Sequence, residues 1–305
     1  MVSFLVNRLF IAIMVTVTVS VIAFSLLRLS GDLAAELAGD DATEAEIAAV
    51  AKAYGLDRPL YVQYLDWAGH AISGDLGQSI FSNEPVFEIL TGAVPTTAKL
   101  AVLALTLGIC LAIPLGITAA VFQNTWIDRL ALIIAVGGQA VPNFWFGLMM
   151  ILLFGVILRW TPISGQETLA HFILPTITVA LTTIPQKMRI TRAGMIEVLQ
   201  SDYIRTAKAK GLAPRSVIFK HALRNAILPV VSLTMVNFGF LLGGTVVVET
   251  IFALNGLGFE AFQAIIRQDF PVLQSVVLFI SVIYIMLTLI ADLINAQLDP
   301  RIRLS

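Results

Sequence analysis

The sequence predicts an all-α membrane protein with six transmembrane helices, a cytoplasmic helical hairpin and a long, partly helical external first loop. Three observations support this fold class. The 305 residues are 58% hydrophobic and only 13% charged, whereas a soluble domain carries about 25% charged residues. Several uncharged runs are long enough to cross a bilayer core of about 30 Å. Basic residues gather in one polar segment and acidic residues in another.

The first span is expected in residues 1–30. Its uncharged run from Leu9 to Leu27 follows Arg8 and is longer than the roughly 7–15 residues of a signal-peptide core, so we expect a span that is not cleaved. The transmembrane core is expected in residues 97–305. Its spans are predicted near residues 100–123, 130–158, 172–192, 225–248 and 270–291.

Loop charge predicts the orientation of these spans. Segment 31–96 holds 11 acidic and two basic residues, whereas segment 187–225 holds nine basic and two acidic residues. Basic loops stay in the cytoplasm, so 31–96 is expected outside and 187–225 inside. Six spans then place both termini in the cytoplasm, in agreement with Arg8, Arg301 and Arg303. We expect a multi-pass protein of the bacterial or archaeal cytoplasmic membrane, called the inner membrane where an outer one exists.

The external segment 31–96 is too long for a plain loop, and its sequence predicts short helices. Thr43 and Glu46 form a capping-box pattern, and Gly55 is a suitable stop for the helix that follows them. Pro59 suits the start of a second short helix. We expect both helices on the membrane surface or on the bundle, and no independent domain.

The spans hold no ionisable residue near their middle. Lys187 and Arg189 fall at the end of the fourth span, where we expect them at the interface with their cations extended to water. Proton-coupled carriers need ionisable groups within the membrane, so proton coupling through this chain's own side chains is disfavoured. A sodium-coupled carrier that uses backbone carbonyls is not excluded.

Polar residues do occur within the predicted spans. Gln139, Pro142 and Asn143 fall near the middle of the third span, and Asn237 falls in the fifth. The amide side chains of Gln139, Asn143 and Asn237 either line a polar translocation path or form hydrogen bonds between helices. Pro142 removes a backbone donor and frees a carbonyl group.

The chain lacks the motifs of an enzyme. It contains no G-x-x-x-x-G-K-[ST], H-E-x-x-H or G-x-S-x-G pattern, so we expect no catalytic residue, no metal site and no bound cofactor. The single cysteine, Cys110, cannot form an internal disulfide and is predicted to be a buried, apolar residue. If the protein performs work, we expect the energy to come from a partner.

Residues 197–224 form a basic, polar island between apolar runs, and we expect a cytoplasmic hairpin of two short helices there. Asp202 is suited to cap the first helix and Gly211 to end it. Pro214 suits the first turn of the second helix.

The two sides of the first hairpin helix differ. Ile204, Ala207 and Gly211 share one narrow face, and the cations project elsewhere: Arg205, Lys208 and Lys210. Such a helix fits a groove with acidic walls on a partner protein, or it lies on anionic lipid through its cations. The residues alone leave both options open.

This segment resembles the cytoplasmic coupling motif of binding-protein-dependent ABC importer permeases, in which an E-A-A triplet is followed after three residues by glycine. Gly211 matches that glycine, so Arg205-Thr206-Ala207 occupies the triplet, with Arg in place of Glu. The later run His221-Ala222-Leu223-Arg224 and the Arg substitution are similar to the dipeptide/oligopeptide/nickel branch, whose members typically read R-T-A-x-A-K-G and H-A-L-R-N-A.

The resemblance covers nearly the whole chain, and the order and spacing of its motifs are highly specific. The further matching motifs are Gly55-Leu56-Asp57-Arg58-Pro59-Leu60 with Gln63-Tyr64, Gly74-Asp75-Leu76-Gly77 with Ser79, Val247-Val248-Glu249-Thr250-Ile251-Phe252 with Gly256-Leu257-Gly258, Asp269-Phe270-Pro271-Val272, and Leu298-Asp299-Pro300-Arg301. Asn255 stands where the family often has proline.

The resemblance implies a permease subunit of an ATP-driven importer for di- or oligopeptides or similar small solutes. The implied partners are a second homologous permease, two ATP-binding cassette ATPases, an extracytoplasmic solute-binding protein and the lipid bilayer, with no nucleic acid. ATP and Mg would be bound by the ATPases and not by this chain. The residues implied in coupling to the ATPases are Tyr203, Arg205, Thr206, Ala207, Lys208, Gly211 and His221.

A second hypothesis remains beside the importer permease. An ion- or proton-coupled secondary carrier or channel with a regulatory cytoplasmic hairpin is also compatible with the absence of an ATPase motif, although the uncharged spans count against proton coupling. The sequence does not distinguish peptides from nickel, glutathione, opines or sugars as the solute, because solute choice lies mainly in the binding protein.

Overall fold

The structure is a computed structural model of the whole chain, and it describes residues 2–30, 33–39 and 42–298. These residues form helices and connecting turns, with one isolated β-bridge between Gln78 and Pro85. The predicted all-α fold class is confirmed. The predicted terminal motif at Asp299-Pro300-Arg301, and Arg303, lie outside the described residues.

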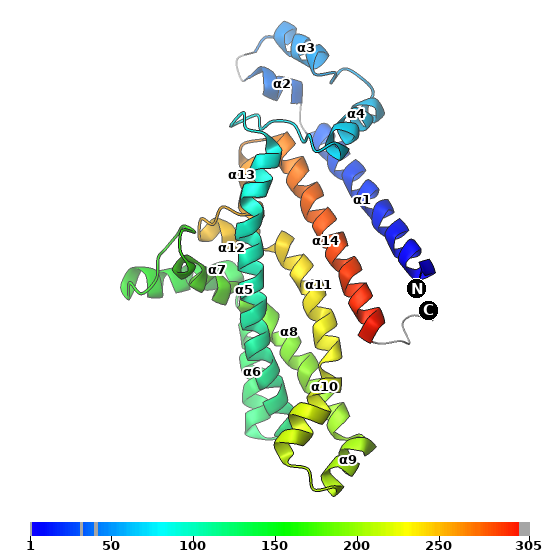
Figure 1. Cartoon of the computed structure of the whole chain (residues 1–305). Coiled ribbons are helices and arrows are strands. Elements are labelled where there is room, and N and C mark those ends of the chain that lie inside the picture. Colours follow the sequence, from blue (N-terminus) through cyan, green and yellow to red (C-terminus); the bar gives the residue numbers. More distant parts are fainter. Residues whose placement is uncertain (1, 31–32, 40–41, 299–305) are drawn as a thin grey trace. The chain divides into compact units, whose positions relative to one another are not determined.

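The chain divides into two compact units. Unit 1 comprises residues 1–97 and 255–289, and unit 2 comprises residues 98–254 and 290–305. The helices that begin in unit 1 are α1 (Val2–Ser30), α2 (Leu33–Ala38), α3 (Glu44–Ala53), α4 (Leu60–Ile72), α5 (Val86–Val121), α13 (Leu257–Ile266) and α14 (Phe270–Leu298), drawn in Figure 1. Helix α5 continues into unit 2.

Helix α4 packs against α1 through aromatic side chains. The Phe24 ring lies 5.5 Å from the Tyr64 ring and 5.8 Å from the Trp67 ring, measured between centroids. The hydroxyl groups of Ser20 and Tyr64 are 2.8 Å apart and share a hydrogen bond. These ring contacts, with Phe24 buried among them, attach the predicted second short helix to the first span.

The short helices form where the sequence predicts them. The Thr43 backbone N–H donates to the Glu46 carboxylate at 2.8 Å, and the Glu46 N–H donates to Thr43 Oγ1 at 3.4 Å. This capping box begins α3, and its hydrogen bonds lower the pKa of Glu46. Gly55 follows the helix at φ +65°, a conformation that glycine adopts without penalty. Pro59 directly precedes α4.

Helix α5 begins earlier than predicted. The sequence indicates a span from about residue 100, but α5 starts at Val86, so the expected external segment 31–96 contains its first turns. A helix extends beyond its apolar run because its backbone hydrogen bonds do not depend on lipid. The early turns are held in unit 1 by a buried cluster in which Val86 and Leu90 pack against Leu257 and Val272.

Unit 2 is arranged around one long helix, α8 (Ile173–Leu199), which contacts α6, α7, α10, α11 and α12. The other elements of this unit are α6 (Trp126–Ala140), α7 (Asn143–Met150), the π-helix η1 (Ile151–Ile157), the 3₁₀ helix η2 (Leu169–Phe172), α9 (Asp202–Ala209), the π-helix η3 (Ser216–Ala222), α10 (Leu223–Ala226), α11 (Leu228–Gly244) and α12 (Val246–Ile251). Close approach of α5 to α8 is possible because Gly116 offers no side chain where Thr191 packs.

Two predicted spans are not straight helices. The span predicted at 130–158 is broken at Pro142, and its halves α6 and α7–η1 meet at 96° (Figure 1). Proline disrupts helical hydrogen bonding there. The span predicted at 225–248 follows a second bend of 51° near Ile227. Within residues 2–30, 33–39 and 42–298, four helices are long and apolar enough to cross a membrane, and the total is six when each bent pair counts as one span.

Cys110 is exposed on α5, so the prediction of a buried cysteine is wrong. An apolar residue of a membrane helix does not need a protein neighbour, because lipid or another subunit covers it equally well.

Candidate functional site

The predicted hairpin is formed by α9 and by the second helical segment, η3 with α10, which follow α8 in the chain (Figure 1). The inner side of α9 carries Ile204 and Ala207, which are 0% and 7% exposed. They join one buried cluster with Val217, Ala222 and Ala226 of the second segment, and this cluster also includes Ile117 and Met195. The hairpin is therefore packed onto α5 and α8 of its own unit.

The ends of α9 follow the sequence signals with one difference. Ser201, and not Asp202, is the N-cap residue, and Asp202 is the first helical residue. At the other end Gly211 has φ +73°, and its N–H donates to the Lys208 carbonyl at 3.0 Å. This left-handed conformation confirms Gly211 as the stop of the first helix. Pro214 begins the second helical segment as predicted.

The exposed side of α9 is polar and basic. Its exposed residues are Asp202, Tyr203, Arg205, Thr206, Lys208, Ala209 and Lys210. The sequence suggests that the small-residue face seats in a partner, but Ile204 and Ala207 are buried within this chain. A partner would therefore meet the charged face and the tip at Gly211, while Ala207 holds α9 in place.

Tyr203 and His221 are brought together by the hairpin. The Asn225 side-chain amide donates to the Tyr203 hydroxyl at 2.7 Å, and that hydroxyl donates to the His221 carbonyl at 3.5 Å. These bonds join α9 to the end of the second segment across 22 residues of sequence. They give the first helix a fixed rotation relative to the second, so that motion of one is transmitted to the other.

The predicted path residues lie on different elements of unit 2. Gln139 is exposed near the end of α6 and accepts a hydrogen bond from Arg189 Nη2 at 3.4 Å. Asn143 is half-buried at the start of α7, immediately after the bend at Pro142. Asn237 is half-buried on α11. Among the described residues, no hydrogen bond joins Asn237 to Gln139 or Asn143.

Sequence analysis did not find the strongest ion pair of unit 2. Arg192 on α8 donates two hydrogen bonds to the Asp128 carboxylate, at 2.6 Å from Nε and 2.7 Å from Nη2. The Asn124 N–H adds a third at 3.0 Å. Asp128 is buried, and this paired geometry is the strongest form of the Arg–carboxylate interaction. The sequence signal that could have indicated this ion pair is the acidic residue Asp128 in the first turn of an otherwise apolar helix.

Lys187 also differs from expectation. It is fully buried in unit 2, and its Nζ has no hydrogen-bond partner among the described residues. The predicted extension of this cation to interfacial water is therefore wrong. The helix continues to Leu199, which leaves Lys187 well inside α8 rather than at its end.

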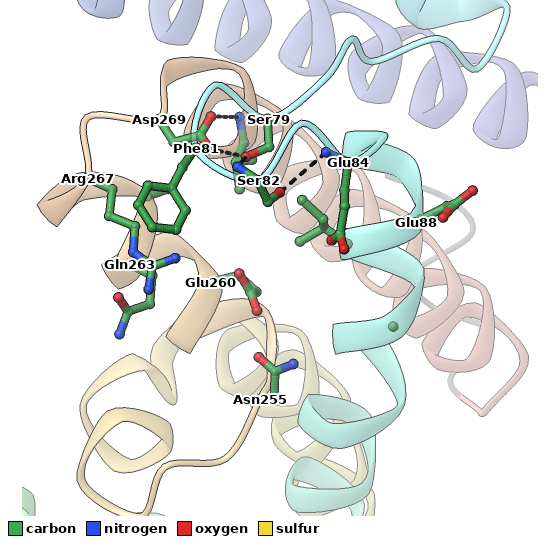
Figure 2. A pocket seen from close by; sticks show the side chains of 14 residues that line it. Ser79, Phe81, Ser82, Glu84, Glu88, Asn255, Glu260, Gln263, Arg267 and Asp269 are labelled. Atoms are coloured by element: carbon green, nitrogen blue, oxygen red, sulfur yellow. Dashed lines mark hydrogen bonds between the residues drawn. The ribbon is translucent and has the colours of Figure 1, made fainter.

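Unit 1 holds a polar pocket of about 460 Å³ between the turn at residues 79–84, the start of α5 and α13 (Figure 2). Asp269 closes one side, where Ser79 donates a short hydrogen bond to its carboxylate and the Ile80 N–H donates another at 3.3 Å. These bonds join the motif that contains Ser79 to the motif that begins at Asp269, 190 residues later in the sequence.

The pocket carries several charged side chains. The Arg267 guanidinium lies 4.0 Å from the centroid of the Phe81 ring, as in a cation–π contact. Burial raises the pKa of Glu260; the charge of Arg267 opposes this shift, and the charges of Glu84 and Asp269 add to it. Figure 2 shows the Glu260 side chain directed into the pocket between α13 and α5.

Comparison with known proteins gives matches over nearly the whole chain. The family described as binding-protein-dependent transport system inner membrane component matches residues 112–304. The N-terminal membrane component of the same transport systems matches residues 1–101.

Two curated relatives illustrate the similarity. The chain is 37% identical to a probable peptide ABC transporter permease protein, y4tP, of Sinorhizobium fredii, over 98% of this chain and 99% of the relative. It is 38% identical to the glutathione transport system permease protein GsiC of Escherichia coli strain K12, over 99% of each chain.

A solved structure of the inward-facing MetNI methionine ABC transporter is similar in fold. Its matching chain has a TM-score of 0.60 and 19% sequence identity, and the match covers 69% of this chain and 96% of that chain. At this identity the similarity concerns the fold alone.

Proposed function

Because the chain belongs to the family of binding-protein-dependent transport system inner membrane components, and is thus a transport permease and not an enzyme, we propose that it imports di- or oligopeptides or similar small solutes. The observation that carries this proposal is the full-length similarity to peptide and glutathione permeases. The chain is a multi-pass protein of the inner membrane. A secondary carrier or channel is therefore set aside.

The proposed assembly contains this chain, a second homologous permease, two ATPases and an extracytoplasmic solute-binding protein. ATP and Mg are bound by the ATPases, which supply the energy that the spans of this chain do not. The two permeases enclose the path, and rigid-body motion opens it to alternate sides of the membrane.

The hairpin is proposed as the element that contacts an ATPase. Its exposed face presents Arg205, Thr206, Lys208 and Gly211, while Ala207 attaches α9 to the spans. Tyr203 and His221 link its two helical segments. Because α9 shares a buried cluster with α5 and α8, a push on the hairpin is transmitted directly to both helices.

Gln139, Asn143 and Asn237 are proposed as residues of the translocation path. Gln139 and Asn143 flank the bend at Pro142, where α6 ends and proline has no N–H to donate to a carbonyl of its last turn. Polar side chains and free carbonyls together can replace the water that a peptide loses on entering the path.

The proposed orientation places segment 31–96 outside and the hairpin inside. Single cysteines at Ser82 and Ala209, both exposed, test it after Cys110→Ala removes the exposed native thiol. We expect an impermeant thiol reagent to label Ser82→Cys in intact cells and Ala209→Cys only after permeabilisation. The reverse labelling would overturn the orientation and the coupling assignment together.

Reconstitution of the complete complex in proteoliposomes tests the function. We expect uptake of labelled trialanine that requires both ATP and the binding protein. Uptake that persists without ATP and follows an imposed ion gradient would contradict the proposal. Omission of the binding protein serves as the matched control.

A further inference from the structure

Arg189 is a charged residue in a membrane-spanning helix, and no residue of opposite charge pairs with it in the part of the chain that the structure describes. It lies within the candidate span Leu169–Leu199 and is exposed. Its guanidinium donates a hydrogen bond to the oxygen of the neutral Gln139 amide. Among the described residues, no carboxylate forms an ion pair with it. A guanidinium in such a span is costly unless it faces water or an anion.

The packing register shows which way this side chain extends. Antiparallel α6 and α8 meet at the Asp128–Arg192 pair and again where Gly138 faces Leu181. Gln139 therefore lies opposite a point on α8 about eight residues before Arg189, which is about 12 Å along the axis. The Arg189 side chain must extend toward the start of α8 to reach Gln139, as long helical side chains do.

This direction excludes the simplest explanation for a charge in the span, which is that Arg189 extends to lipid phosphate. A cation that snorkels to lipid phosphate extends toward the nearer membrane surface, which in the proposed orientation is the cytoplasmic one, on the Arg192 side of Arg189. Arg189 extends the opposite way, toward the bend at Pro142. Gln186, three residues earlier, is also exposed and shares the same helix face, so this face of α8 is polar.

We propose that Arg189, oriented by Gln139, binds the carboxylate of the solute during translocation. This inference rests on the proposed import of peptides, which carry a terminal carboxylate unless their C-terminus is modified. Arginine is suited to the role because its planar guanidinium donates two parallel hydrogen bonds to a carboxylate. Gln139 occupies only one donor of the group, which leaves the others for the solute.

A fixed ion pair with an acidic residue of the second permease would also neutralise Arg189, and the test separates the two cases. Uptake of trialanine and of its C-terminal amide is measured in the reconstituted complex. Each rate is normalised to the fraction of binding protein that the probe loads, so the binding protein's own preference cancels between variants.

For Arg189→Gln we expect kcat/KM for trialanine to fall about ten- to hundredfold, the range for a lost charge-assisted hydrogen bond, while the amide is unaffected. Arg189→Lys should retain part of the preference for the free acid. Arg129→Gln is the matched control, because Arg129 is an exposed arginine on α6, and it should change neither rate.

Equal losses for both probes in Arg189→Gln would overturn the inference, since they indicate a role in assembly or in pairing with the second permease. Unchanged uptake of both probes would overturn it as well. Failure of the wild-type complex to import either probe is a different outcome, which refutes the proposed solute class and removes the basis of the inference.

Discussion

Replacing Gly211 by valine tests whether the hairpin couples ATP hydrolysis to transport. Gly211 ends α9 at φ +73°, and a Cβ added there meets no atom within 4 Å. The Cβ of the variant therefore introduces no clash inside the chain. The cost is the left-handed backbone, about 1–2 kcal/mol for a residue with Cβ, and β-branched valine belongs at the upper end of that range.

A penalty of this size lowers the ratio of ordered to disordered hairpin by about 5–30-fold. It does not unfold the spans, because the buried cluster around Ile204 does not include Gly211. We expect Gly211→Val to insert into the membrane normally. In the reconstituted complex it should show weaker co-purification of the ATPases or loss of substrate-stimulated ATP hydrolysis.

Gly211→Asn separates the two causes of such a defect. Asparagine tolerates the left-handed region but adds a side chain of similar size, so it tests close approach of a partner with little backbone strain. A defect in both variants indicates a partner in contact with the tip, and a defect in valine alone indicates strain. A Gly211→Val complex that assembles, responds to substrate and transports normally would refute coupling through this hairpin.

Three further predictions concern stability. Asp128→Asn should destabilise unit 2 by about 3 kcal/mol, since it leaves Arg192 without its counter-charge. A double-mutant cycle with Arg192→Gln in chemical unfolding should give a coupling energy well above zero. Simple additivity of the two effects would contradict this pairing. Gly116→Ala should cost about 1–3 kcal/mol, because its Cβ would lie 2.6 Å from Thr191 Cβ and 2.8 Å from the Met188 carbonyl oxygen. Gly92→Ala on the same helix, with no atom within 4 Å, should be neutral or stabilising in the same melting assay. The folded-state pKa of Glu260 lies above the usual 4.5, so the contribution of Glu260 to stability is greatest below the unfolded pKa and is lost as pH rises through the folded pKa. Glu260→Gln should therefore raise stability at pH 7 and flatten the dependence of stability on pH. An unchanged pH profile would refute the assignment.

Several features were readable from short stretches of sequence. The capping box at Thr43 and Glu46 and the stop at Gly211 depend on hydrogen bonds between residues a few positions apart. Such bonds form largely independently of the rest of the protein. The two-helix hairpin was predicted for the same reason, since its caps and its proline lie within it.

The positions of the site residues could not be predicted from local sequence patterns alone. The hairpin pattern identified the small face of α9 but not its neighbour, and the structure buries Ile204 and Ala207 against the chain's own helices. Helical periodicity shows which residues share a face and does not show what covers that face. The prediction that Lys187 extends to interfacial water was wrong for a similar reason. The burial of Lys187 depends on how far α8 extends and on what packs around it.

The amino-acid sequence by itself determined the fold class, the apolar runs that form the spans, and the segregation of charge, because each follows from composition and local periodicity. The tertiary structure alone decided the 96° bend at Pro142, the pairing of Asp128 with Arg192 across 64 residues, and that of Ser79 with Asp269 across 190. It also directed Arg189 toward Gln139. These features depend on the packing of distant helices, and the register of that packing is set by side-chain volumes and small-residue contacts summed over both surfaces.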